Sequence, residues 1–248
     1  MTDATQKTLL ITGAGQRIGA ALAEYAAADG WNLVLHANRS RDEAEALAKK
    51  LREKHSVSVL VTQADLRDQA ALADFWNGLP PVTALVHNAA TFERDTLASM
   101  HTATLQTQLQ VNFTAPLILT QGFMKQLPDG ARGSVTILGD GVMGWSVSPE
   151  FFSYAISKQA WIGALDILAS ACAPRARVNL IALAPTLPNA NDTPEMFARL
   201  AERAPLKRTS EPTEVAAALG YFLNAEGVTG QVLSLAGGAH LKAHRPTS

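Results

Sequence analysis

The chain alternates short apolar runs with longer segments in which apolar residues recur every three to four positions. The apolar runs are TLLITG, WNLVLHAN, VSVLVTQADL, VTALVHNAA, SVTILGD, RVNLIALAP and QVLSLAGG. Segments of helical period separate them, and long helices are predicted at residues 105–125 and 152–171. Seven strand-like runs that alternate with helices predict an α/β fold, a doubly wound, seven-stranded and mostly parallel sheet with helices on both faces.

Length, charge and cysteine count limit which kinds of protein and partner we expect. No linker or repeat divides the 248 residues, so one domain is predicted over residues 1–248. The formal net charge of −1 gives no electrostatic reason to expect nucleic acid or an anionic membrane as partner. Cys172 is the only cysteine and is read as a small buried residue rather than a nucleophile. The N-terminus lacks a charged and then apolar leader, so we expect a cytoplasmic protein.

The first predicted strand ends in a glycine-rich turn. Ligands of doubly wound sheets lie beyond the carboxyl ends of the strands, so the residues there are the candidates for binding. Gly13, Gly15 and Gly19 stand between this strand and a helix that is expected to begin at Arg17 or Ile18. Such glycines let backbone N–H groups and the helix N-terminus meet a pyrophosphate. An ordinary helix-entry turn is the alternative for this spacing.

The second strand end indicates which dinucleotide would bind. A site for NAD carries Asp or Glu about 20 residues after the glycines, but this strand continues into Asn38, Arg39 and Ser40, and the first acid is Asp42. A guanidinium and a hydroxyl can bind the 2′-phosphate that a carboxylate would repel. Arg17 adds charge for a further anionic group, so the predicted cofactor is NADPH. The alternative for Arg39 is a solvated surface cation.

The third and fourth strand ends fit the same ligand. Asp65 could reach an adenine amino group or could cap the helix predicted in RDQAAL, and both roles can hold. Asn88 is followed by Ala89 and Ala90, which are small enough for the backbone to lie against a ribose.

The segment Tyr154-Ala-Ile-Ser-Lys158 carries the candidate chemistry. A helix places positions i and i+4 on one face, so the phenol and the ammonium would face one site. The ammonium is expected to lower the tyrosine pKa toward working pH, which would make the phenol a usable general acid. A surface pair without function is the alternative.

These motifs, taken in order, resemble the short-chain dehydrogenase/reductase family along nearly the whole chain. They are TGxxxRxG, Asp65-Leu66, Asn88-Ala89-Ala90, Asn112 in VNF, Tyr154 and Lys158. The resemblance implies a Rossmann-type fold in which Tyr154 donates a proton and Lys158 binds the nicotinamide ribose and assists Tyr154. It also implies that Asn112 holds a proton-relay water in a kinked helix.

Within that family the chain is similar to pteridine reductases and dihydromonapterin reductases. Arg17 replaces a family glycine, and the second strand ends in HANRS, residues 36–40. Pteridine reductases carry an aspartate 13 residues before the tyrosine; here position 141 is glycine and Asp140 comes one residue earlier. With a one-residue insertion in GVMGWSVSPEFF, Asp140 would share hydrogen bonds with Tyr154 and the substrate. A carboxylate suits the guanidine-like edge of a pterin.

The resemblance extends to the residues around the substrate. Phe92 would stack the pterin against the nicotinamide, with a core phenylalanine as the alternative. The turn of residues 184–189 resembles dihydromonapterin reductases, residues 189–204 are expected to be a substrate lid, and residues 242–248 a C-terminal tail. The implied cofactor residues are Gly13, Gly15, Arg17, Ile18, Gly19, His36, Asn38, Arg39, Ser40, Asp65, Leu66, Asn88, Ala89, Ala90, Tyr154, Lys158, Pro185, Thr186 and Leu187. The implied substrate residues are Arg17, Phe92, Asp140 and Tyr154, the catalytic ones are Tyr154, Lys158, Asp140 and Asn112, and no metal site is expected.

Three functions compete at this point. The first is an NADPH-dependent reductase of a pterin or dihydropterin. The second is a carbonyl reductase of an unrelated ketone, with Asp140 or Ser146 polarising the oxygen. The third is a redox sensor that binds NADPH without turnover, against which the intact Tyr154, Lys158 and Asn112 argue. A homotetramer is expected, because family members pair the two long helices across a two-fold axis.

Overall fold

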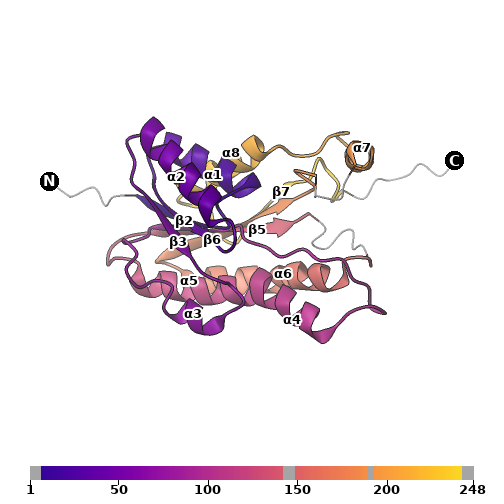
Figure 1. The fold of residues 1–248 in the computed structure, drawn as a ribbon, viewed down its shortest axis with the longest axis horizontal. Helices are drawn as coiled ribbons and strands as arrows, with labels where there is room; N and C mark the ends of the chain where they lie inside the picture. Colours follow the sequence, from indigo (N-terminus) through magenta and orange to yellow (C-terminus); the bar gives the residue numbers. More distant parts are fainter. Residues whose placement is uncertain (1–6, 142–148, 189–192, 242–248) are drawn as a thin grey trace.

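The computed structural model describes residues 7–141, 149–188 and 193–241. Seven parallel strands form one sheet in the order β3-β2-β1-β4-β5-β6-β7, which confirms the predicted fold class (Figure 1). The strands are β1 (Thr8–Thr12), β2 (Asn32–Ala37), β3 (Val59–Gln63), β4 (Ala84–His87), β5 (Gly133–Asp140), β6 (Ala176–Leu183) and β7 (Val232–Leu235). The chain leaves β1 toward β2 on one side and later returns to β4 on the other, which creates the crevice where such sheets bind ligands.

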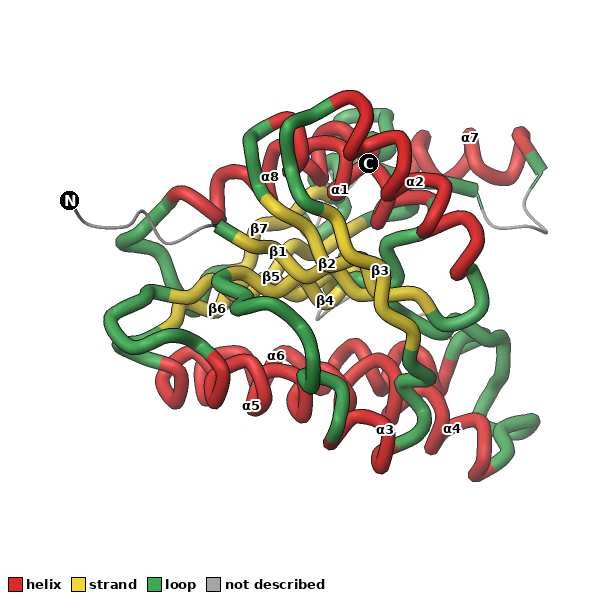
Figure 2. The backbone as a smooth tube through the Cα atoms, turned by 60° about the vertical axis from the view of Figure 1, so that its left-hand side comes forward, coloured by secondary structure: helices red, strands yellow, loops and turns green. Residues whose placement is uncertain are grey.

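Helices cover both faces of the sheet. Figures 1 and 2 show α1, α2 and α8 over one face and α3, α4, α5 and α6 over the other. Their bounds are α1 (Arg17–Ala28), α2 (Arg41–Lys54), α3 (Gln69–Ala73), α4 (Thr102–Leu109), α5 (Ala115–Gln126), α6 (Phe152–Cys172), α7 (Pro194–Arg203) and α8 (Pro212–Asn224). In the parts of the chain that the structure describes, no helix has the length and apolarity needed to cross a bilayer.

Two hydrophobic cores lie on opposite faces of the sheet. Leu9 and Ile11 of β1 pack with Leu22 of α1 and Leu219 of α8, whereas Leu10 belongs to the core beneath α5 and α6. Successive residues of a strand point to opposite faces, so a strand covered on both sides is apolar at most of its positions. This explains why the sequence shows unbroken apolar runs rather than alternation. Cys172 is buried in the second core, as predicted.

The helix predicted over residues 105–125 is interrupted near Asn112, where the family resemblance implied a kink. A π-helical turn, η1 (Gln110–Thr114), joins α4 to α5. The helix predicted in RDQAAL is only five residues long, and its N-cap is Asp68, whose carboxylate accepts from the backbone N–H groups of Ala70 and Ala71. The prediction that Asp65 caps this helix is therefore wrong, because the helix begins one turn later than the apolar pattern suggested.

Helix α7 was not predicted as a helix. Thr193 caps it by accepting a hydrogen bond from the N–H of Met196, and Pro194 occupies its first turn. The sequence Thr-Pro-Glu is a helix-start signal that would have found it. The predicted substrate lid at residues 189–204 thus includes a helix over 194–203, and residues 189–192 and 242–248 lie outside the described residues.

Candidate active site

A cleft of about 740 Å³ lies at the carboxyl ends of the first four strands of the sequence. Most of the residues predicted for the nucleotide line it: Gly13, Arg17, Ile18, Gly19, His36, Asn38, Arg39, Ser40, Asp65, Leu66, Asn88, Ala89 and Ala90. Sequence reasoning missed several others that line it, namely Gln16, Glu43, Arg67, Thr91, Glu93, Thr107 and Val111. Its volume is within the usual range for sites that bind small molecules and cofactors.

The glycine-rich turn brings the backbone of β1 against the start of α1. Gly13 has a φ of +64°, and a Cβ atom on Gly19 would lie 2.2 Å from the carbonyl oxygen of Gly13. The N-cap residue Gln16 provides no side-chain hydrogen bond to the helix. The first N–H groups of α1 can therefore serve an anion in the cleft. Gly15 does not line the cleft, because it packs against Ser40, where a Cβ atom would approach the carbonyl oxygen to 2.8 Å.

Side chains from two strand ends hold this turn in place. The amide of Asn88 donates to the carbonyl oxygens of Thr12 and Gly13, each at 2.8 Å. The imidazole of His36 accepts from the N–H of Gly13 at 3.3 Å and lies 3.1 Å from the carbonyl oxygen of Ala64. Burial lowers the pKa of His36, so the ring is neutral and can accept at Nδ1.

Arg17 extends from this turn to the segment that follows β6. Its guanidinium donates to the carbonyl oxygens of Pro188 at 3.0 Å and Leu187 at 3.3 Å. Its backbone φ of 55° lies in the left-handed region, which is uncommon for a residue with a side chain. The predicted cofactor residues Pro185, Thr186 and Leu187 do not line the cleft themselves, but this contact ties their segment to the glycine-rich turn.

Of the residues predicted to be catalytic, Asp140 lies at the end of β5, and Tyr154 and Lys158 lie in the first turns of α6. The hydroxyl of Tyr154 donates to Oδ2 of Asp140 at 2.7 Å, so the carboxylate reaches the phenol despite the one-residue offset in the sequence. Lys158 is 5% exposed and donates from Nζ to the carbonyl oxygen of Leu138 at 3.0 Å. Its Nζ lies 5.8 Å from the centre of the Tyr154 ring, so both side chains face one site.

The prediction that the ammonium lowers the pKa of Tyr154 is wrong for this structure. Burial and the neighbouring Asp140 carboxylate raise the pKa of Tyr154 well above 10. Burial lowers the pKa of Lys158 to about 8, and Asp140 opposes that change. The hydroxyl bonds to a carboxylate and not to the ammonium, so the nearest charge is of the opposite sign to that expected. Tyr154 therefore keeps its proton at neutral pH.

The π-helical turn places Asn112 between the cleft and α6. Its amide donates to the carbonyl oxygen of Thr91 at 3.0 Å and to Oγ of Ser157 at 2.9 Å, and its Oδ1 accepts from the N–H of Thr91. The indole of Trp161 donates to its backbone carbonyl at 3.0 Å. Asn112 is 2% exposed and thus fixes the distance between the residues after β4 and the catalytic helix.

Phe92 lies beside Tyr154. Its ring stacks on Phe151 with a centroid distance of 4.5 Å and meets the ring of Tyr154 edge-on at 4.6 Å. It is 44% exposed, so the alternative of a core phenylalanine is wrong. A partly exposed aromatic ring next to Tyr154 can contact a flat substrate.

The start of α6 is held by a residue that sequence reasoning missed. Phe151, the N-cap residue, has no capping side chain, and the buried carboxylate of Asp95 takes that role from a distant loop. It accepts from the N–H of Ser153 at 2.9 Å and from its hydroxyl at 2.5 Å, and the Asp95 carbonyl accepts from the N–H of Phe152 at 3.0 Å. Asp95 therefore fixes the first turn of the helix that carries Tyr154.

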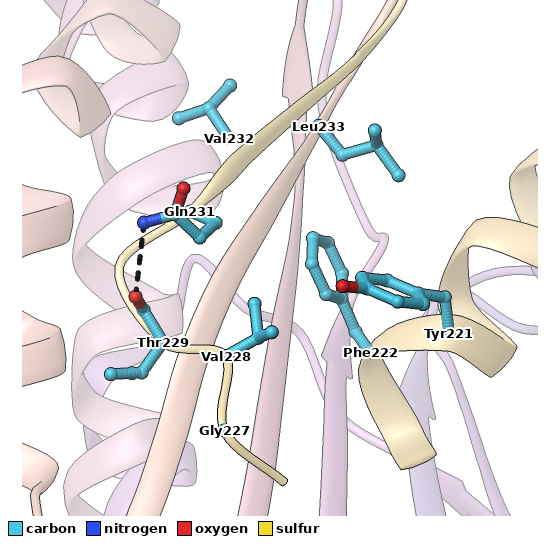
Figure 3. Close-up of a pocket in the computed structure, with 8 residues that line it drawn as sticks. All are labelled: Tyr221, Phe222, Gly227, Val228, Thr229, Gln231, Val232 and Leu233. Carbon is cyan, nitrogen blue, oxygen red and sulfur yellow. Dashed lines mark hydrogen bonds between the residues drawn. The ribbon is translucent and has the colours of Figure 1, made fainter. Parts of the chain in front are cut away.

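Within the described ranges, no group of three or more His, Cys, Asp or Glu residues could hold a metal ion. Ser146, the alternative polarising residue, lies outside the described residues. A second hollow of about 390 Å³ lies at the start of β7, where Tyr221 and Phe222 of α8 face the strand (Figure 3). It is at the amino end of the strand, away from the carboxyl ends where the polar residues meet.

Comparisons with known proteins agree with this geometry. A family model described as short chain dehydrogenase matches residues 7–196. The crystal structure of FolM alternative dihydrofolate reductase 1 from Brucella suis in complex with NADP superposes with a TM-score of 0.87. It is 35% identical, over 97% of this chain and 98% of that one.

Curated relatives include two enzymes of different activity. The dihydromonapterin reductase of Enterobacter sp. (strain 638) is 26% identical over 97% of this chain and all of its own length. The 3-oxoacyl-[acyl-carrier-protein] reductase FabG of Aquifex aeolicus is also 26% identical, over 94% of this chain and 96% of its own length. With the family model covering most of the chain, the protein belongs to the short-chain dehydrogenase/reductase family of oxidoreductases.

Proposed function

We propose that this enzyme reduces a pterin or dihydropterin, with NADPH as the hydride donor and Tyr154 as the proton donor. The observation that carries the proposal is the hydrogen bond between Tyr154 and Asp140, with the exposed Phe92 ring next to it. The FolM and dihydromonapterin reductase relatives support this substrate class by their names.

The residues of the cleft fit NADPH. The uncapped N-terminus of α1 and the close backbone approach at Gly13 and Gly19 suit a pyrophosphate. Arg39 and Ser40 line the cleft at the end of β2, where an NAD-specific site would carry a carboxylate. When bound, NADPH supplies the hydride. The NADP in the FolM complex supports this assignment.

The chain's own residues handle the proton. Tyr154 gives its hydroxyl proton to the nitrogen of the reduced C=N bond, or to the oxygen if the substrate is a ketone. The phenolate that results lies near the ammonium of Lys158, which stabilises the negative charge. Asn112 ties the residues after β4 to α6, so the proton donor and the substrate wall keep a fixed separation.

Asp140 favours a substrate with an amino-bearing edge. Its carboxylate raises the pKa of Tyr154, which by itself makes the phenol a weaker acid. A substrate that donates hydrogen bonds to Asp140 withdraws negative charge from the phenol and makes proton transfer easier. A pterin has such an edge, whereas a simple ketone does not. The substrate would therefore help to activate its own proton donor.

The direct test follows NADPH absorbance with dihydrobiopterin and, separately, with a panel of ketones. The proposal expects faster consumption with the dihydropterin. Phe92→Ala should slow pterin reduction about two- to tenfold, because aromatic stacking contributes about 0.5–1.5 kcal/mol. Leu97→Ala is the matched control, because Leu97 is an exposed apolar residue on the same loop. If the enzyme reduces ketones but not dihydrobiopterin, the proposed pterin substrate is rejected.

A carbonyl reductase is the second candidate, supported by the FabG relative. The same tyrosine and lysine would serve, with Asp140 as a hydrogen-bond partner of Tyr154. A sensor that binds NADPH without turnover is disfavoured, since it would have no use for Tyr154 and Lys158 in one buried site.

We further propose that residues 1–248 form one domain, that the protein is cytoplasmic, in keeping with its single buried cysteine, and that it assembles as a homotetramer. Ile162 and Ile167 of α6 are 51% and 72% exposed, which suits helix pairing across a two-fold axis. Light scattering at micromolar concentration should give the mass of four chains, and a monomer mass would reject this assembly.

A further inference from the structure

Three charged residues, Arg39, Asp65 and Arg67, line the cleft where β2 and β3 end. The two strands pair in parallel, with Ala37 beside Gln63. Beyond the strands the N–H of Ala64 still donates to the carbonyl oxygen of Ala37 at 3.3 Å. Arg39 and Asp65 each follow two residues after these paired positions, so they lie next to each other on the wall of the cleft. Arg67 lines the same wall.

Arg67 engages both oxygens of the Asp65 carboxylate. Its Nε donates to Oδ1 at 2.9 Å and to Oδ2 at 3.0 Å, and Nη2 donates to Oδ2 at 2.5 Å. The backbone N–H of Arg67 also donates to Oδ1 at 3.0 Å. The two residues are neighbours in the chain, so the pair forms without bringing distant segments together. Within the described ranges, Arg39 forms no ion pair.

The charges of the three residues are coupled. The hydrogen bonds from Arg67 are the largest cause of the lowered pKa of Asp65, and the positive charge of Arg39 contributes to the same effect. Asp65 is thus close enough to Arg39 for the two to attract each other. If Arg67 did not hold it, the Asp65 carboxylate would compete with a bound phosphate for Arg39.

We propose that Arg67 determines the preference for NADPH by holding Asp65, which leaves the Arg39 guanidinium to bind the 2′-phosphate. This inference rests on the proposed NADPH cofactor and on the role of Arg39. Arg67 need not touch the phosphate itself. NADH carries a hydroxyl at that position, so its binding does not depend on whether Asp65 competes for Arg39.

The test compares dissociation constants for NADPH and NADH, measured by nucleotide fluorescence, for the wild type, Arg67→Ala, Asp65→Asn and the double variant. Arg67→Ala should weaken the binding of NADPH about tenfold at low salt and the binding of NADH less than about twofold. The double variant should recover NADPH affinity to within about threefold of the wild type, because an asparagine keeps an acceptor but carries no charge to compete for Arg39.

Arg41→Ala is the matched control. Arg41 lies at the same edge, and its guanidinium donates to the side chain of Gln63 rather than to Asp65. Arg41→Ala should weaken the binding of NADPH far less than Arg67→Ala does. Adding Asp65→Asn to Arg41→Ala should not restore any affinity that is lost.

Three results would overturn the inference: no loss of NADPH affinity in Arg67→Ala, an equal loss for both nucleotides, or no recovery in the double variant. Failure of the proposed cofactor is distinguishable from these. It would appear as a wild type without preference for NADPH, whereas an Arg39→Ala variant that keeps the preference would reject the role of Arg39 and not the cofactor. If Arg39→Ala abolishes the preference and Arg67→Ala leaves it intact, only the role of Arg67 fails.

Discussion

The site has two ends, the nucleotide cleft and the predicted catalytic residues beside it, and they differ in how far their charges are exposed to solvent. At the nucleotide end, Arg67 and Asp65 form an ion pair whose side chains are 49% and 33% exposed, beside a backbone turn that is held by Asn88 and His36. At the catalytic end, Lys158 and Asn112 are buried, and Tyr154 and Asp140 share a hydrogen bond. Salt screens exposed charges strongly and buried charges much less, and burial itself shifts the pKa values of Lys158 and Tyr154. The nucleotide end should therefore respond to ionic strength and the catalytic end to pH.

The largest effect is expected for Tyr154→Phe. The variant keeps the ring that packs against Phe92 but loses the hydroxyl that carries the proton. Turnover should fall about 10²–10⁴-fold, the usual contribution of a general acid, while NADPH affinity changes little. Single-turnover kinetics and nucleotide titration measure the two quantities. Turnover near that of the wild type would mean that another group donates the proton, and Asp140 would be the first to examine.

The next largest effect is expected for Arg39→Ala, which should act only at the nucleotide end of the site. Loss of one charge-assisted contact to a phosphate costs about 1.5–3 kcal/mol, which corresponds to about 10–150-fold in NADPH affinity. The affinity for NADH should change far less, and the difference should shrink at high salt. Titration of both nucleotides at two ionic strengths tests this. An equal loss for both nucleotides would separate Arg39 from the 2′-phosphate.

A smaller effect is expected for Asp95→Ala, which uncaps the catalytic helix. Loss of a helix cap costs about 1 kcal/mol, so turnover should fall about fivefold as the first turn of α6 loosens around Tyr154. Asp68→Ala is the matched control, because Asp68 caps α3 in the same way. Both variants should lose similar free energy of unfolding, but only Asp95→Ala should lose turnover. Equal turnover in the two variants would contradict the positioning role.

The pH dependence should be the mildest signal. The pKa of Lys158 is about 8, so the ammonium loses its charge as pH rises through that value rather than through 10.5. The kcat/KM for NADPH, which reports the free enzyme, should therefore fall severalfold above pH 8. Tyr154 contributes no such decline, because its pKa lies well above 10. Lys158→Arg should remove the decline, since arginine stays charged. A flat wild-type profile from pH 7 to 9.5 would contradict the assignment.

The residues and contacts at the two ends of the site could not be predicted equally well from the sequence. The strand ends were readable, because unbroken apolar runs and the glycine-rich turn define them locally. Contacts between residues far apart in the chain could not be predicted. Asp95 and Ser153 are 58 positions apart, and no spacing rule connects them. The direction of the Tyr154 pKa shift was wrong, because it depends on burial and on which charge lies nearest. Arg67 was not predicted although it is only two residues from Asp65, because the sequence does not show in which direction an exposed arginine side chain turns.

The most direct test of the account is the ratio of kcat/KM for dihydrobiopterin to kcat/KM for a ketone, measured in the wild type and in Asp140→Asn. The substitution preserves size and removes the charge that an amino-bearing edge would meet beside Tyr154. A charge-assisted hydrogen bond contributes about 1.5–3 kcal/mol, so the account predicts that the ratio falls tenfold or more. A ratio that stays unchanged, or a wild type that reduces ketones but not dihydropterins, would contradict it.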